Sequence, residues 1–200
     1  MISRDEEKGA EPMGAEAPPS QLLDDPHGLG DLTLLERSAW AMTWAGVTSL
    51  QARVEADVHR ECGLTPFELH LLYILSSNGE EPNGVEMPMS LVAQQLDSSL
   101  SRLSHVVRRL EARGWLHRRS SPEDARVTLV SLEEAGLAKV KQSVGPYARI
   151  IRHVLLDRFD GGELRTIVRL WTQALSELSA THWLLEALPR DEEAEGADGA

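Results

Sequence analysis

The residues best suited to do chemistry in this sequence are the arginines gathered between Ser98 and Arg126. This window holds seven arginines against three acidic residues, which gives it a formal charge of +4. An arginine can grip the edge of a guanine with two hydrogen bonds and can pair with phosphate oxygens. The serines and histidines in the same window can also donate hydrogen bonds to base edges or phosphates. The window therefore predicts a contact with nucleic acid.

Two short amphipathic helices are predicted to position these side chains. Their apolar residues recur at steps of three and four, as they do along one side of a helix. Between the helices lies the sequence Asp-Ser-Ser, at residues 97–99, which favours turns and helix N-caps. This order is typical of a helix-turn-helix, whose second helix presents its N-terminal residues to base edges. The apolar positions are Met89, Val92, Ala93 and Leu96 in the first helix, and Leu103, Val106, Val107 and Leu110 in the second.

A β-hairpin is predicted directly after the second helix. Arg113 and Gly114 end that helix, since a basic last turn followed by glycine is typical of a helix C-terminus. Residues 115–119 and 127–132 are strand-like runs on either side of a charged, proline-containing tip at residues 120–126. A helix-turn-helix followed by a basic hairpin is a winged helix. The predicted fold class is therefore mainly α with a small β-hairpin wing (α+β).

The stretch from Met87 to Leu132 resembles the DNA-binding core of the multiple-antibiotic-resistance regulator (MarR) family. The resemblance extends more loosely from Leu32 to Leu188. It implies a winged helix-turn-helix transcriptional regulator, a repressor, that binds double-stranded DNA at a pseudo-palindromic operator as a homodimer. The ordered combination of helices, arginine–glycine pair, basic strand and Asp-x-Arg tip is more specific than a helix-turn-helix alone. The matching residues are Leu91, Val92, Ala93, Leu96, Ser99, the run 107–111, Arg113, Gly114, Arg118, Arg119, the run 122–126, Leu132 and Gly136.

The second helix is the predicted recognition helix, with Ser99 as its cap. Arg108 and Arg109 lie further along and suit phosphate contacts, which position a protein without reading sequence. Two positions depart from the family: Leu100, where a polar or basic residue is common, and Arg108, where an acidic one is. The alternative for this face is the ordinary solvated side of an amphipathic helix, but the seven arginines in one window favour DNA contact. The residues expected to face DNA from the first turns are Ser99, Ser101, Arg102, Ser104 and His105.

The hairpin tip is the second part of the predicted interface. The resemblance implies that Arg126 enters the minor groove, where narrow A·T-rich segments attract a guanidinium. Asp124 would orient arginines by paired hydrogen bonds rather than touch DNA. Arg118 and Arg119, on the first arm, are expected to contact phosphates. Ala125 occupies a position that is often basic in the family, and the alternative for this tip is a plain turn with a surface ion pair.

Long helices are predicted on both sides of the winged helix, the first from Leu32 to His59. Its apolar side includes two tryptophans, which either pack within the chain or form a dimer interface. We expect the dimer, because a short winged helix cannot cover this face alone. Thr65 to Glu68 and Ser131 to Glu134 both fit capping boxes, and Asp160 offers a further N-cap. Gly145–Pro146 should kink or split the helix after the wing.

Charge is distributed unevenly along the chain. The formal net charge is −12, but residues 1–30 hold two basic and seven acidic side chains, and residues 189–200 hold one basic and five acidic. Binding depends on the local basic surface rather than on the total charge. The predicted organisation is a disordered acidic tail at 1–30, an N-terminal dimerisation helix at 31–62, the winged helix-turn-helix domain at 63–132, C-terminal dimerisation helices at 133–188 and a disordered acidic tail at 189–200.

Several other classes of protein find little support in the sequence. No apolar run approaches the ~18 residues of a membrane span, and the charged N-terminus lacks a secretory signal. The single cysteine, Cys62, suits a reducing cytoplasm, where we expect the protein to act. The sequence has no Gly-rich phosphate loop, G-x-S-x-G elbow or H-E-x-x-H zinc signature. Neither an enzyme, nor a cofactor, nor a metal is therefore predicted.

Two alternative functions stay open. One is a winged-helix module for protein–protein contacts that has lost DNA binding, which the acidic tails and Ala125 would suit. The other is a metal- or redox-responsive regulator that is switched at His59 and Cys62. These two residues could share a helical face, but a structural zinc needs four ligands.

The resemblance also implies a small aromatic or phenolic effector. Such a ligand would bind at the junction of the dimerisation and DNA-binding layers. Trp40, Trp44 and His70 are the residues predicted to line this site. Ordinary core packing would explain the same three residues equally well.

Overall fold

The chain divides into two compact units after Ser49. The computed structural model describes residues 31–77, 86–179 and 182–187. The two predicted tails lie outside the described residues. Among the helices that are described, none combines the length and the apolar character needed to cross a membrane.

The first helix, α2 (Leu34–Cys62), begins at a capping box and ends at a glycine. The Thr33 hydroxyl accepts a hydrogen bond from the Glu36 N–H at 3.3 Å, and the Glu36 carboxylate accepts one from the Thr33 N–H at 2.7 Å. At the other end, Gly63 has a φ of 63°, and its N–H donates to the His59 carbonyl at 2.9 Å. Glycine adopts this left-handed conformation at little cost. The predicted long helix is confirmed, with both ends slightly later in the sequence.

The next helix, α3 (Pro66–Ser77), starts with the capping box that the sequence predicts. The Thr65 hydroxyl accepts from the Glu68 N–H at 3.2 Å, and the Glu68 carboxylate accepts from the Thr65 N–H at 2.8 Å. Pro66 takes the first helical position, where its missing N–H has no intrahelical partner to lose. One side of α3 is buried, through Glu68, Leu69, Leu71, Leu72 and Leu75.

The predicted helix-turn-helix is confirmed as α4 (Met89–Gln95) and α5 (Leu100–Ala112). Ser99 caps α5 as expected, since its hydroxyl accepts a hydrogen bond from the Arg102 N–H at 3.2 Å. After α5, Gly114 has a φ of 69° and turns the chain into the sheet. The local signals in the sequence were sufficient here, because each cap and its partner lie within a few residues.

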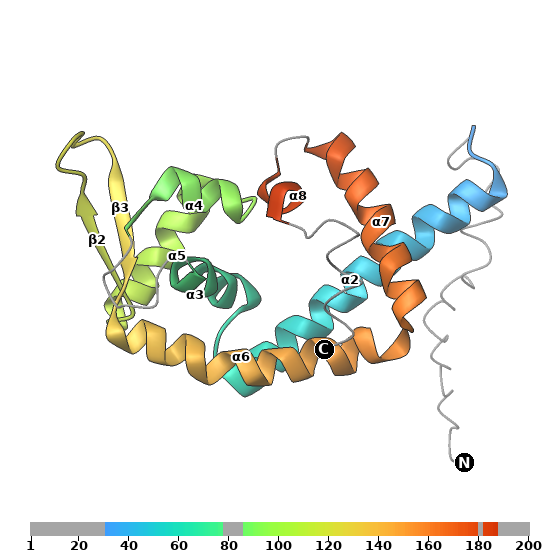
Figure 1. Cartoon of the computed structure of the whole chain (residues 1–200), viewed down its shortest axis with the longest axis horizontal. Coiled ribbons are helices and arrows are strands. Elements are labelled where there is room, and N and C mark those ends of the chain that lie inside the picture. Colours follow the sequence, from blue (N-terminus) through green and yellow to red (C-terminus); the bar gives the residue numbers. More distant parts are fainter. Residues whose placement is uncertain (1–30, 78–85, 180–181, 188–200) are drawn as a thin grey trace, which may run out of the picture. The chain divides into compact units, whose positions relative to one another are not determined.

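A small antiparallel sheet carries the wing, with its strands in the order β1-β3-β2. The hairpin of β2 and β3 is labelled in Figure 1. β2 (Leu116–Ser120) and β3 (Thr128–Leu132) pair over their full lengths, which confirms the hairpin. β1 (Met87–Pro88) pairs with the other side of β3 and was not predicted. Two residues are too few to show a strand periodicity, and the proline in β1 is tolerated only because this is an edge strand.

The helix after the wing, α6 (Glu134–Val154), starts later than the predicted cap. Ser131, which was expected to cap it, is buried in β3 opposite His117. Glu133 takes the N-cap position instead, without a side-chain capping hydrogen bond. The Glu133 N–H still donates to the Trp115 carbonyl at 3.0 Å, so strand pairing continues up to the start of the helix. The prediction of Ser131 as the cap is wrong, because pairing with β2 holds it in the sheet.

The predicted break at Gly145–Pro146 does not split α6, which runs through both residues. A proline inside an isolated helix costs about 3 kcal/mol. Ile150, four residues further on, is buried and holds this end of the helix against the core. Tertiary packing of this kind routinely outweighs helix propensity, so the prediction of a split was wrong.

The last long helix, α7 (Gly161–Leu178), carries the predicted cap at Asp160. The Asp160 carboxylate accepts from the Glu163 N–H at 2.9 Å, and the Glu163 carboxylate accepts from the Asp160 N–H at 2.9 Å. No residue of α7 is buried. A short 3-10 helix, η1 (Leu156–Arg158), precedes it, and α8 (Trp183–Ala187), which was not predicted, follows.

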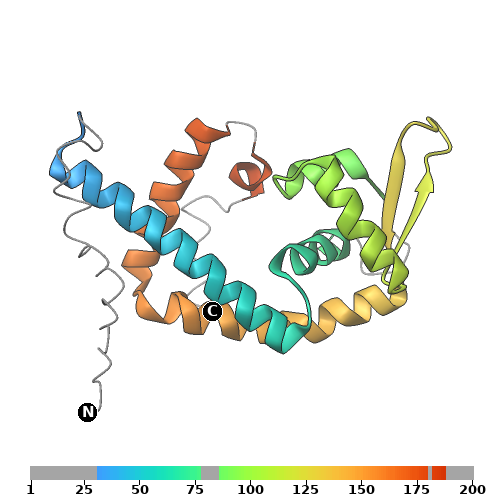
Figure 2. The same cartoon turned by 180° about the vertical axis from the view of Figure 1, so that it is seen from behind.

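The core of the second unit lies among α3, α4, α5, the sheet and α6. Its fully buried side chains include Leu71, Leu72, Leu103, Leu110 and Val130. In Figures 1 and 2, the β2–β3 hairpin stands at the edge of this unit, with its tip pointing away from α6. The core therefore fixes the exposed side of α5 and the hairpin relative to each other.

Candidate nucleic-acid interface

The exposed side of α5 carries a line of polar residues at the spacing of one helical face. Ser101, His105 and Arg108 follow one another at steps of four and three, and all three are exposed. Ser104, at the border of this face, is half-buried. The opposite side of the helix is buried in the core, through Leu103, Val106, Val107 and Leu110. The predicted recognition helix thus presents the residues that the sequence analysis named.

Arg102 and Arg109 border this line on the side that faces α3. The guanidinium carbon of Arg102 lies 4.5 Å from the centre of the Phe67 ring, in a cation–π contact. The guanidinium of Arg109 donates to the Glu68 carboxylate at 3.0 Å. A cation–π contact orients Arg102 without neutralising its charge, whereas the carboxylate neutralises Arg109. The two arginines are therefore different in what they can offer to a ligand.

Glu68 is the carboxylate that faces the arginines on this side of α5. Its side chain is almost fully buried, and it accepts hydrogen bonds from the Thr65 N–H and from Arg109, with an Arg113 nitrogen at 3.8 Å. Burial alone would raise the pKa of Glu68, but the hydrogen bonds from the Thr65 backbone and Arg109 outweigh it and hold the pKa below its usual range. The charged form is therefore the stable one in the folded protein.

Replacing Glu68 with glutamine is expected to lower the free energy of unfolding at pH 7 by about 1–2 kcal/mol, because it removes a buried charge that is paired with Arg109. A carboxyl with a lowered pKa contributes stability above its unfolded-state pKa, near 4.5. That contribution disappears as the pH falls through the folded-state pKa. Urea unfolding at pH 7 and pH 4 should therefore show a smaller difference between the wild-type protein and Glu68→Gln at the lower pH.

Glu123→Gln is the matched control, since Glu123 is exposed at the hairpin tip and no ion pair of its carboxylate occurs among the described residues. This variant should unfold like the wild-type protein at both pH values. A Glu68→Gln protein that is as stable as the wild-type at pH 7 would show that the buried pair contributes nothing.

The two arginines of the first hairpin arm are also held by carboxylates. Arg118 donates to Glu111 of α5 at 2.9 Å, and Arg119 donates to Glu86 at 2.6 Å. The hydrogen bond from each arginine is the main cause that lowers the pKa of its carboxyl partner. Contacts of Arg118 and Arg119 with phosphate stay a prediction. Either contact would have to compete with an existing ion pair.

The hairpin tip is built around Asp124. Its carboxylate accepts from the Arg126 N–H at 2.9 Å and pairs with the Arg126 guanidinium through two hydrogen bonds of 3.1 Å. The Ser121 N–H donates to the Val127 carbonyl at 2.8 Å and closes the tip. The Arg126 side chain is 91% exposed, and the same hydrogen bonds hold the pKa of Asp124 below its usual range. Asp124 thus orients Arg126 while leaving it accessible.

Tertiary structure therefore sorts the seven arginines into two groups. Arg109, Arg113, Arg118, Arg119 and Arg126 each lie near a carboxylate. Arg102 and Arg108 have no carboxylate partner within the described residues. Sequence reasoning missed four partners that decide this division: Phe67, Glu68, Glu86 and Glu111. Only Glu68 carried a signal, as the third residue of a capping box, and that signal did not reveal its contact with Arg109.

The residues predicted to line an effector site fall in different units. Trp40 and Trp44 belong to the first unit, where their ring centres lie 6.0 Å apart and their side chains are 55% and 61% exposed. The lining of an effector site by these residues stays a prediction. His70 belongs to the second unit, where its Nε2 lies 2.8 Å from the Tyr147 hydroxyl. Burial lowers the pKa of His70 and raises that of Tyr147, so both stay neutral near pH 7.

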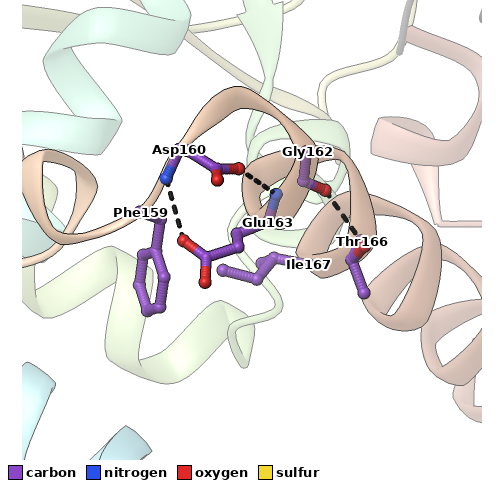
Figure 3. A pocket seen from close by; sticks show the side chains of 6 residues that line it. All are labelled: Phe159, Asp160, Gly162, Glu163, Thr166 and Ile167. Atoms are coloured by element: carbon purple, nitrogen blue, oxygen red, sulfur yellow. Dashed lines mark hydrogen bonds between the residues drawn. The ribbon is translucent and has the colours of Figure 1, made fainter.

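One open depression lies at the start of α7 (Figure 3). Phe159, Asp160, Glu163 and Ile167 are among the residues that line it. Figure 3 shows that the two carboxylates are turned to the backbone N–H groups at the start of the helix. Because the capping box already uses these donors, the depression offers an anionic ligand little to bind.

The geometry does not support a metal or redox site at His59 and Cys62. Cys62 is buried, with its Sγ 3.9 Å from the Ser143 carbonyl oxygen, whereas His59 is exposed. No group of three or more potential ligands that could hold a metal ion occurs within the part of the chain that the structure describes. The two residues do not meet on one surface.

Comparison with known proteins agrees with this architecture. Residues 64–128 match the profile of the MarR family. The fold is similar to that of Sco3205, a MarR family transcriptional regulator from Streptomyces coelicolor solved in complex with DNA, at 24% identity over 76% of this chain and 96% of that chain, with a TM-score of 0.69. AbsC, a MarR family transcriptional regulator from the same organism, gives 26% identity over 75% of this chain and 98% of that chain, with a TM-score of 0.67.

A more distant likeness shows the same fold. S. aureus MepR, solved in complex with DNA, is 16% identical over 69% of this chain and 96% of that chain, with a TM-score of 0.59. No curated protein sequence matches the chain significantly. Residues 64–128 of this chain are therefore a MarR family domain, and the chain has the winged-helix fold of that family's transcriptional regulators.

Proposed function

We propose that this chain is a DNA-binding transcriptional regulator that acts as a homodimer. Each subunit places α5 in a major groove and the β2–β3 hairpin in the adjacent minor groove. The observation that carries the proposal is the exposed line of Ser101, His105 and Arg108 on α5, bordered by Arg102. DNA complexes of the similar proteins Sco3205 and MepR support it.

The proposed DNA contacts are of two kinds: some read base edges, and the others bind the backbone and position the protein. Arg102, beside the Ser99 cap, suits a base edge, because Phe67 orients its guanidinium and leaves its donors unpaired with carboxylate. Arg108, further along α5, suits a phosphate. Arg126 suits the minor groove, where Asp124 presents it at the hairpin tip. Arg109, Arg118 and Arg119 are assigned a weaker role, as each gives up part of an ion pair to reach DNA.

Exposed apolar residues on two helices support the homodimer. On α7, Val168, Trp171 and Leu178 recur at steps of three and seven and are 49–79% exposed. In the first unit, Trp40 and Trp44 are exposed as well. Large apolar side chains exposed on one side of a helix are typical of a surface that binds another protein. A two-fold dimer places its recognition helices about one helical turn of DNA apart, so we infer a pseudo-palindromic operator.

Repression, a cytoplasmic location and control by a small aromatic or phenolic ligand are part of the proposal through family resemblance. The division into dimerisation helices at 31–62 and 133–188 around a DNA-binding domain at 63–132 is proposed on the same ground. An effector would act only by binding one spacing of the two DNA-binding lobes more tightly than the other.

Selection of binding sites from random duplex DNA, followed by titration against salt, tests the proposal. We expect a palindromic motif and a steep fall of affinity with salt. Arg102→Ala and Arg126→Ala should each weaken binding about tenfold or more, as loss of a base contact costs about 1–3 kcal/mol. Arg108→Ala should weaken binding to all sequences and make the salt slope shallower by about one.

Arg152→Ala is the matched control, because Arg152 is an exposed arginine of α6 that loses the same charge. Its effect on affinity should be small compared with that of Arg108→Ala. Equal effects of Arg152→Ala and Arg108→Ala would mean that only the overall charge matters. The absence of any enriched motif would overturn the proposal.

One observation favours a second candidate function, a winged-helix module that binds protein rather than DNA. Most arginines of the window are already paired with carboxylates, and Ala125 replaces a basic wing residue. This alternative predicts weak, sequence-independent binding to DNA and a partner that does not respond to Arg102→Ala or Arg126→Ala.

A further inference from the structure

The short helix α8 lies against the turn of the helix-turn-helix. The indole N–H of Trp183 donates to the Gln95 carbonyl at 2.8 Å. The Nε2 of His182 lies 3.3 Å from the Asp97 carboxylate, and the His182 and Trp183 rings are stacked with their centres 5.9 Å apart. Figures 1 and 2 both show α8 beside the end of α4. This contact joins residues that are 88 positions apart in the sequence.

The contact lies at the start of the proposed recognition helix. Gln95 is the last residue of α4, and Asp97 comes two residues before the Ser99 cap of α5. From Ala187, the end of α8, the chain continues for 13 residues to Ala200. An extended segment of that length spans up to about 45 Å, whereas α5 is about 20 Å long. Residues 188–200 can therefore reach any point on the exposed side of α5.

The charges of the two partners are complementary. Residues 188–200 hold five acidic side chains and one arginine. The exposed side of α5 holds Arg102 and Arg108, which have no carboxylate partner within the described residues, and His105 between them. A short chain of carboxylates presents to these guanidinium groups the same kind of acceptor as a DNA phosphate strand.

We propose that the acidic segment 188–200 binds the Arg102–Arg108 side of α5 within the same chain and competes with DNA for it. α8 is the anchor that holds the segment there. The competition with DNA rests on the proposed function, whereas the binding of the segment to α5 does not. Tethering beside α5 gives the segment an effective concentration in the millimolar range, so weak ion pairs are sufficient.

The contact between α8 and the helix-turn-helix is weak enough to dissociate. It consists of one hydrogen bond, from Trp183 to Gln95, and one ion pair, between His182 and Asp97, which forms only when the histidine is protonated. Next to it, the side-chain oxygen of Gln95 is buried without a hydrogen-bond partner among the described residues, which disfavours the docked state. A segment held this way lowers DNA affinity by a limited factor and yields to a specific operator.

The test neutralises the segment in the full-length chain, with Asp191→Asn, Glu192→Gln, Glu193→Gln, Glu195→Gln and Asp198→Asn together. DNA affinity is expected to rise between about twofold and tenfold at low salt, because the binding-competent fraction of the protein increases. The gain should shrink as salt screens the ion pairs. An unchanged affinity would overturn the competition with DNA.

The matched control carries the same change of charge at the other end of the chain, with Asp5→Asn, Glu6→Gln, Glu7→Gln, Glu11→Gln and Glu16→Gln. A rise in affinity equal to that of the C-terminal variant would show an effect of net charge alone and would overturn the proposal. Trp183→Phe, which keeps a ring and removes the N–H donor, should raise affinity in the wild-type background only. A rise that persists in the neutralised background would mean that α8, rather than the acidic segment, obstructs DNA.

A measurement without DNA separates failure of this inference from failure of the proposed function. In NMR spectra, neutralising the segment should shift the amide signals of Ser101, Arg102, His105 and Arg108, and high salt should remove the difference. Unchanged signals would overturn the inference. Shifted signals in a protein that binds no DNA would support the binding of the segment to α5 and would refute the proposed function instead.

Discussion

Replacing Gly136 with alanine is expected to lower the free energy of unfolding by about 3 kcal/mol. Gly136 is buried in the first turn of α6. A Cβ at this position would lie 2.2 Å from the Trp115 carbonyl oxygen and 3.0 Å from a methyl carbon of Leu132. The carbonyl is backbone and already accepts the Glu133 N–H at 3.0 Å, so it cannot move aside without breaking the junction between sheet and helix. Overpacking against such an atom lies at the upper end of the usual 1–3 kcal/mol.

Urea unfolding followed by circular dichroism measures this loss. Gly145→Ala in the same helix is the control, because a Cβ there meets only the end of the flexible Arg149 side chain at 3.8 Å. It should stabilise the protein by up to about 1 kcal/mol, since alanine restricts the unfolded chain more than glycine does. If Gly136→Ala proves as stable as Gly145→Ala, then α6 does not approach the Trp115 backbone as closely as described.

Replacing Trp171 with aspartate is expected to abolish the proposed homodimer and to weaken binding to a two-half-site operator at least 100-fold. Trp171 is 49% exposed on the apolar side of α7, between Val168 and Leu178. A carboxylate buried there in a dimer interface would have to lose its water without gaining a partner. A monomer binds one half-site at a time and loses the gain from linked binding, which reaches about 10²–10⁴.

Light scattering after size exclusion reports the oligomeric state, and titration with operator DNA reports the affinity. Affinity for a single half-site should stay unchanged, because Trp171 lies outside α5 and the hairpin. The control is Gln173→Asp, an exposed position on the other side of α7. A Trp171→Asp protein that remains dimeric would show that α7 is not the interface.

The local features of the winged helix were predictable from sequence, because each depends on residues that are close in the chain. The caps at Thr65, Ser99 and Asp160 each place a side chain three residues from the N–H that it accepts, and all three occur as expected. Gly114 ends α5 through its own backbone conformation. The hairpin needs only two runs of alternating residues and a turn between them.

Tertiary structure decided which of these local signals prevailed. Ser131 and Glu134 fit a capping box as well as Thr65 and Glu68 do, but pairing with β2 keeps Ser131 in the sheet. Gly145–Pro146 was expected to kink or split the helix, but α6 runs through both residues, and the buried Ile150 beyond them holds this end against the core. In both places a non-local contact outweighed a local preference, which no pattern in the sequence could show.

For the arginines of the candidate interface too, the sequence determined one part and the tertiary structure decided the other. The sequence by itself determined that seven arginines lie in a helix, a strand and a turn that share one region of the fold. Only the tertiary structure decided which carboxylates form ion pairs with them. Glu68 pairs with Arg109, and Glu86 pairs with Arg119. Arg102 and Arg108 have no carboxylate partner within the described residues. The reason is physical. Side chains 33 and 41 positions apart pair because the core brings their elements together, and no local spacing encodes that approach.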